Sequence, residues 1–119
     1  MPALNFQNRF ADQVESGQKR QTIRLQRKRP IVVNDKLYLY TGMRTKHCRK
    51  LGETYCRQVT PIKMGRNYVH LMTEGEPWDM GPPAREWFAR RDGFDSWKAM
   101  CQWFSRQHGL PFEGVLIVW

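Results

Sequence analysis

The chain has 119 residues and a formal net charge of +9, and 40% of its residues are apolar, 13% aromatic and 26% charged. This composition predicts one globular domain over residues 1–119 and excludes a disordered chain. The excess of positive charge favours an anionic partner such as RNA, DNA or a nucleotide. No apolar run approaches the ~20 residues of a membrane-spanning helix, so we expect no membrane association.

Cysteine usage predicts the compartment and argues against a zinc site. The N-terminal residues lack the apolar core of a secretory signal, and an odd number of cysteines indicates free thiols in a reducing cytoplasm. The cysteines and the three histidines do not follow a zinc-binding spacing. We therefore predict a cytoplasmic protein that holds no metal and no other cofactor. The cysteines are Cys48, Cys56 and Cys101.

Hydrophobic periodicity in the first two thirds of the chain predicts a short helix followed by strands. Phe6, Phe10 and Val14 recur on one helical face, and Gly17 stands where that helix ends. The strand after the turn at 34–35 alternates leucine with tyrosine, which predicts cover on both of its sides. The strands that we predict here are 20–24, 36–42, 53–62 and 67–72.

The last third of the chain predicts a loop, two helices and a buried strand. Residues 73–83 are rich in Gly and Pro and predict a loop, and a short helix at 84–93 follows it. Asp95 is the predicted N-cap of the second helix. The closing apolar run, 114–119, predicts a buried strand. The apolar stripe of the second helix comprises Phe94, Trp97, Met100, Cys101 and Phe104.

This order of elements predicts an α+β fold in which a small β-barrel has helices packed outside it. The side chains of so small a barrel fill its interior. A ligand must therefore bind in a cleft at the rim of the barrel.

The segment 17–29 concentrates positive charge in a predicted strand. Six of its thirteen residues are Lys or Arg. Arg20, Thr22 and Arg24 share one strand face, and Ile23 on the other face points to the core. Lys19, in the preceding turn, can fold over the same face as Thr22. This pattern fits an anion site, and it fits equally a solvated edge strand whose charges prevent edge-to-edge pairing.

Two further segments help to distinguish an anion site from a solvated edge strand. A second basic cluster at 44–50 favours the anion site, because phosphate contacts beside aromatic surfaces are typical of RNA-binding proteins. Asp92, in "ARRDGF", is a candidate acid or hydrogen-bond acceptor at a helix end. Spacing alone favours a helix-ending Asp paired with a neighbouring Arg. The members of the second cluster are Arg44, Lys46, Arg49 and Lys50.

Together these motifs resemble the ASCH family, whose members have a PUA-like barrel. The resemblance covers nearly the whole chain and rests above all on "SGQKRQTIR" followed by "ARRDGF", with "NDKLYLYTG", "CRKLG" and "GVLIVW" between and after them. It implies that RNA or nucleotides bind in a cleft between the barrel and its helices. One branch of the family deacetylates acetylcytidine, and another is described as a ribonuclease.

The resemblance implies site residues by motif position. It places the catalytic Lys of the deacetylating branch at Lys19, the Thr at Thr22 and the acid at Asp92, and Arg24 matches the Arg that follows the Thr. The branch has Glu where this chain has Asp92, so the carboxylate here is one methylene closer to the backbone. A hydrolase with these residues uses the Thr hydroxyl as a nucleophile.

Nucleophilic catalysis by Thr22 requires a nearby base. Lys19 can act as that base only if its pKa falls from about 10.4 towards about 7–8. The positive charges of Arg20 and Arg24, together with burial, lower the pKa of Lys19, and Asp92 opposes this shift. Binding requires no such change. We therefore predict a protein that binds RNA or a modified nucleoside, with an amidohydrolase or a ribonuclease as alternatives and no protein partner specified. The predicted nucleic-acid contacts are Arg20, Arg24, Arg27, Arg44, Lys46, Arg49 and Lys50.

Overall fold

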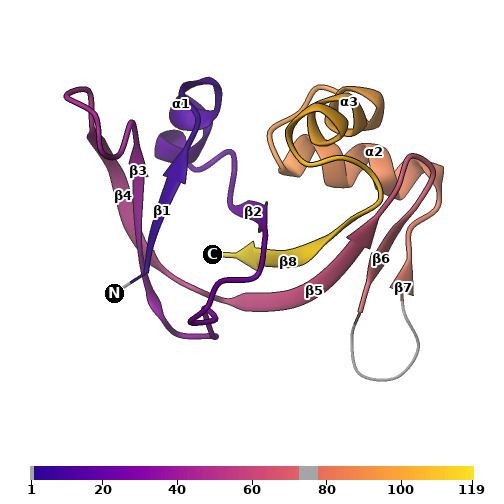
Figure 1. The fold of residues 1–119 in the computed structure, drawn as a ribbon, viewed down its shortest axis with the longest axis horizontal. Coiled ribbons are helices and arrows are strands. Elements are labelled where there is room, and N and C mark those ends of the chain that lie inside the picture. Colours follow the sequence, from indigo (N-terminus) through magenta and orange to yellow (C-terminus); the bar gives the residue numbers. More distant parts are fainter. Residues whose placement is uncertain (1, 73–77) are drawn as a thin grey trace.

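A computed structural model describes residues 2–72 and 78–119, which form three helices and eight strands (Figure 1). The predicted α+β class is confirmed. In chain order the elements are β1 (Ala3–Phe6), α1 (Asn8–Ser16), β2 (Gln21–Arg24), β3 (Lys36–Thr41), β4 (Arg49–Tyr55), β5 (Gln58–Met64), β6 (Val69–Leu71), β7 (Trp78–Asp79), α2 (Pro82–Arg91), α3 (Trp97–Gln107) and β8 (Phe112–Val118).

The described strands form two hydrogen-bonded sheets, so the predicted closed barrel is not confirmed. The first sheet has the order β1-β3-β4, and the second has the order β2-β8-β5-β6-β7. β1 runs parallel to β3, whereas every other pairing is antiparallel. In Figure 1, α1 lies beside the first sheet, and α2 and α3 lie together at the far end of the second.

The single strand predicted at 53–62 is wrong, because the chain passes from one sheet to the other at Cys56 and Arg57. The backbone N–H of Cys56 donates to the carbonyl oxygen of Asp35 (2.8 Å), which closes the β3–β4 ladder. The N–H of Arg57 donates to the carbonyl of Val118 (2.7 Å), which begins the pairing of β5 with β8. Each half of this segment therefore belongs to a different sheet.

The strand β1 is a second departure from the sequence prediction. Phe6 was expected on a helical face with Phe10 and Val14, but it ends β1, and α1 begins two residues later, at Asn8. Leu4 and Phe6 alternate with exposed or half-buried residues and point into the core, as a strand requires. Phe10 and Val14 are buried on α1, and Gly17 (φ 85°) ends that helix as predicted.

One apolar core joins both sheets and all three helices. Leu37 of the first sheet, Ile117 of the second and Met100 of α3 are almost completely buried within it. Aromatic rings connect its parts: Phe10 of α1 meets Phe94 edge-on, with ring centroids 5.4 Å apart. Because the core is shared, the two sheets hold a fixed position relative to the helices.

Of the two C-terminal helices, α2 begins earlier than predicted and α3 begins later. α2 starts at Pro82, within the segment predicted to be a loop, and of that segment 73–77 lies outside the described residues. α3 is capped by Ser96, whose Oγ accepts a hydrogen bond from the N–H of Ala99 (3.0 Å), so the predicted cap, Asp95, is wrong. No helix in the described part of the chain is long and apolar enough to cross a membrane.

Substitution of the α3 cap tests this assignment. Ser96→Ala removes the acceptor for the Ala99 N–H and is expected to lower the free energy of unfolding by about 1 kcal/mol. Asp95→Ala, one residue earlier, removes an exposed side chain and is expected to have a smaller effect. Urea unfolding of the two variants measures the difference, and a larger loss in Asp95→Ala would show that the cap is assigned to the wrong residue.

Candidate functional site

A cleft of about 760 Å³ lies where the strands meet the helices. Side chains of β1, α1, β2, α3 and the end of α2 line it. One part of its lining is aromatic, formed by Phe10, Phe94 and Trp103. The predicted site residues that line the same cleft are Lys19, Thr22, Arg24, Arg27, Arg44 and Asp92.

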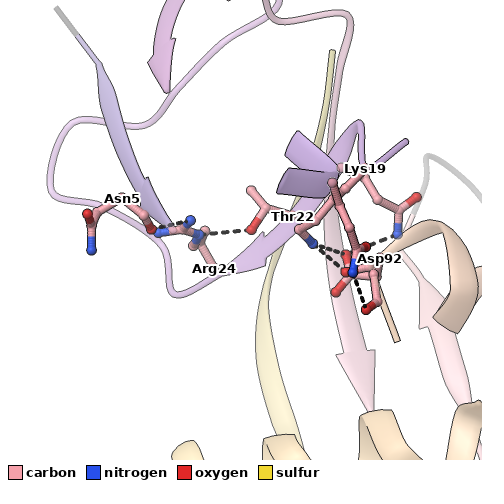
Figure 2. Close-up of polar contacts among 8 residues, drawn as sticks. Asn5, Lys19, Thr22, Arg24 and Asp92 are labelled. Carbon is pink, nitrogen blue, oxygen red and sulfur yellow. Dashed lines mark hydrogen bonds and ion pairs between the residues drawn. The ribbon is translucent and has the colours of Figure 1, made fainter. Parts of the chain in front are cut away.

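At one end of this cleft, Lys19 and Asp92 form a buried ion pair (Figure 2). The Lys19 Nζ lies 3.4 Å from Asp92 Oδ1, and both side chains are at most 4% exposed. The same ammonium donates to the backbone carbonyl of Asp92 and lies 4.9 Å from the centre of the Phe10 ring. Two residues that are 73 positions apart in the sequence are thus joined.

Local backbone geometry explains how the end of α2 reaches Lys19. Gly93 adopts a left-handed conformation (φ 97°), and a Cβ there would lie 2.8 Å from Gln13 Oε1 and 3.2 Å from Lys19 Cδ. Gln13 of α1 accepts from the Lys19 N–H at its carbonyl (2.9 Å) and donates from Nε2 to the Gly93 carbonyl (3.3 Å). Gly93 therefore permits the close contact that positions Asp92.

Gln21 belongs to this end of the cleft, although the sequence analysis gave it no role. Its Nε2 donates to Asp92 Oδ1 (3.2 Å), and the residue is buried. Gln21 begins β2 and Lys19 lies two residues before it, and both side chains contact Asp92. The spacing of two residues between Lys19 and Gln21 is the sequence signal that could have identified Gln21.

At the other end of the cleft, Arg24 connects the two sheets. Its Nε donates to Thr22 Oγ1 (2.9 Å), and its Nη2 donates to the backbone carbonyl of Asn5 in β1 (2.7 Å), as Figure 2 shows. Its guanidinium also lies 4.8 Å from the centre of the Phe6 ring. Thr22 and Arg24 share a strand face as predicted, and Ile23 is buried in the core.

The remaining predicted contacts do not gather in the cleft. Arg20 is exposed, and its Nε donates to the carbonyl of Gly17 (3.2 Å). Arg49 pairs with Glu15 (2.9 Å) and Lys50 with Glu53 (3.2 Å) on the surface. Lys46 is exposed and lies outside the cleft lining. The basic segment at 44–50 therefore contributes Arg44 to the cleft but does not act as one cluster.

Burial dominates the electrostatics of the site. It lowers the pKa of Lys19, and the charges of Arg24 and Arg9 act in the same direction, whereas Asp92 opposes them. Burial also raises the pKa of Asp92 against the effect of Lys19 and of the Gln21 hydrogen bond. The pKa of Arg24 falls to about 10, again mainly through burial. Arg20, the expected positive neighbour of Lys19, is not among the groups that shift its pKa.

Metal ligation finds no support in the described residues, where no three His, Cys, Asp or Glu side chains come close enough to hold an ion. Comparisons with protein-family models, with curated proteins and with solved structures found no match to this chain. The ASCH resemblance therefore rests on the sequence motifs alone.

Removal of Lys19 tests how much the ion pair with Asp92 contributes to the stability of the fold. Lys19→Met leaves a buried carboxylate unpaired and is expected to lower the free energy of unfolding at pH 7 by about 3 kcal/mol. Without Lys19, burial raises the pKa of Asp92 further, so the carboxyl is stabilised in its protonated form as the pH falls towards its raised pKa. The loss should therefore be smaller at pH 5 than at pH 7, as measured by urea unfolding.

Lys63→Met is the matched control, because Lys63 pairs with Glu113 (3.4 Å) on the surface. It should cause little loss of stability at either pH. A loss in Lys19→Met that is equally large at both pH values, or no greater than that of the control, would contradict the description of the buried pair.

Proposed function

We propose that this chain binds RNA or a modified nucleoside in the cleft around Lys19, Thr22, Arg24 and Asp92, as a member of the ASCH family with its PUA-like fold. The observation that carries the proposal is the convergence of these four side chains, from segments far apart in sequence, in one cleft. A volume of about 760 Å³ falls within the range of about 300–1,000 Å³ typical of small-ligand sites.

The chemistry of the cleft suits a nucleobase. Trp103, which is half-buried and lines the cleft, offers apolar surface to a base. The carboxylate of Asp92 accepts hydrogen bonds, and an exocyclic amine such as that of cytosine donates them. The Thr22 hydroxyl already accepts from Arg24, which leaves its own proton available for a ligand oxygen.

A second candidate function, hydrolysis of an acetylated cytidine-like base, draws support from the lowered pKa of Lys19. This reaction requires Lys19 to become neutral, to leave its contacts with Asp92 and to take the proton of the Thr22 hydroxyl while the Thr22 oxygen attacks the acetyl carbonyl. The carbon–nitrogen bond then breaks, and the proton leaves with the amine of the base. Water finally hydrolyses the ester on Thr22 and releases acetate. Binding remains the first proposal, because it requires no change in protonation.

Base-dependent affinity tests the binding proposal. At one fixed salt concentration, the wild type should bind short RNAs of different base composition with different affinities. Arg24→Gln should lower these affinities about tenfold, because the variant loses a charge inside the cleft. Fluorescence anisotropy measures both effects.

Arg57→Gln provides the control, since it removes one exposed charge that does not line the cleft. Salt-dependent binding alone would not support the proposal, because any strongly basic protein shows it. If every RNA binds with equal affinity and both variants lose equal affinity, general charge attraction explains the binding and the proposal is wrong.

Turnover of acetylcytidine separates the two functions. If the chain is a hydrolase, the wild type releases cytidine, whereas Thr22→Ala and Asp92→Asn do not, and Thr22→Ala still binds the nucleoside. Chromatography of the reaction mixture measures the release. Binding of acetylcytidine by the wild type without release would reject hydrolysis and favour recognition.

A further inference from the structure

We propose that the cleft selects a nucleoside that carries a phosphate group, which Arg27 and Arg44 hold at the mouth of the cleft. This inference rests on the proposed nucleoside site and adds to it a phosphate subsite, which a neutral nucleoside leaves empty. It follows from the balance of charge in the cleft, from the free arginine side chains and from the turn that carries Arg44.

Positive charge in the cleft exceeds what its acidic group can neutralise. Four cationic side chains line it, whereas Asp92 is the single acidic residue among the described lining residues. Lys19 takes up the charge of Asp92 in the buried pair, which leaves three guanidiniums without a carboxylate partner in the cleft. Arg27 also lies close enough to Arg24 to lower its pKa. A bound anion relieves this repulsion.

The arginines differ in their freedom to bind such an anion. Arg24 uses its Nε on Thr22 and its Nη2 on Asn5, so it is held in place by the protein. Arg27 and Arg44 are exposed, and neither guanidinium forms an ion pair or a hydrogen bond with the described residues. Their donors are therefore available, and a guanidinium fits phosphate oxygens with two parallel hydrogen bonds.

Arg44 sits in a defined turn. Asn5 Oδ1 accepts from the backbone N–H of Met43 (3.0 Å), and the Thr45 hydroxyl closes the turn by donating to the Gly42 carbonyl (2.6 Å). Arg44 itself adopts a left-handed conformation (φ 67°). Since the carbonyl of Asn5 also accepts from Arg24, Asn5 is a positioning residue that fixes the turn of Arg44 relative to Arg24.

The cleft consequently has two chemically different ends. Figure 2 shows Thr22 between the Arg24–Asn5 contact on one side and the Lys19–Asp92 pair on the other. The Lys19 end adjoins Phe10, and Asp92 there accepts hydrogen bonds. The Arg24 end adjoins the turn of Arg44 through Asn5. We assign the base to the first end and the phosphate to the second.

Calorimetric titration tests this assignment with cytidine, cytidine 5′-monophosphate and the dinucleotide cytidylyl-cytidine. The wild type should bind at least one of the two phosphate-bearing compounds about tenfold more tightly than cytidine. Tighter binding of the monophosphate indicates a terminal phosphate, and tighter binding of the dinucleotide indicates the phosphodiester of an RNA chain. The combined change Arg27→Gln with Arg44→Gln should bring the affinity ratio close to one, and Asn5→Ala should reduce it in part.

The combined change Arg57→Gln with Arg106→Gln removes the same charge outside the cleft lining and should retain the ratio. A ratio near one in the wild type, with cytidine bound, would overturn the phosphate inference and leave the proposed function intact. An equal fall in the control pair would also overturn it, because general charge would then explain the preference. If none of the three compounds binds, the phosphate inference fails, whereas the proposed function is decided by the anisotropy measurements with RNA and by binding of acetylcytidine.

Discussion

The buried ion pair between Lys19 and Asp92 is the interaction on which the site depends. Removing two charges from water is unfavourable by several kcal/mol per ion, so such a pair persists only where geometry and further hydrogen bonds compensate. Here Gln21 donates to the same carboxylate oxygen, and the ammonium also binds the Asp92 carbonyl. The pair thus fixes the end of α2 against the start of β2 and determines where the cleft forms.

A second polar contact, from Arg24 to Asn5, connects the two sheets beside the cleft. β1 and β2 belong to different sheets, so this hydrogen bond crosses a boundary that no strand ladder spans in the described residues. The same guanidinium holds the Thr22 hydroxyl. The hydroxyl, the carboxylate and the cations therefore keep fixed relative positions before any ligand arrives, which reduces the entropy lost on binding.

Local sequence signals predicted the parts of the structure that depend on neighbours in the chain. Gly17 ends α1, and apolar alternation located β3, because each depends on a few adjacent residues. The passage from β4 to β5 at Cys56 escaped prediction, since it depends on backbone partners far along the chain. Lys19, Thr22 and Asp92 were placed in one cleft by motif resemblance. The local sequence around Asp92 does not show that the end of α2 packs against the start of β2, because that contact joins segments far apart in the chain.

The pairing of β2 has a consequence for the order of events during synthesis. Among the described strands, β2 hydrogen-bonds only with β8, which is the last of them in chain order. The strand that carries Thr22 and Arg24 therefore lacks its ladder until residues 112–118 have left the ribosome. A nascent chain cannot assemble the cleft and hold a ligand before β8 has emerged. Any engagement of ligand must wait until β8 has emerged and paired with β2.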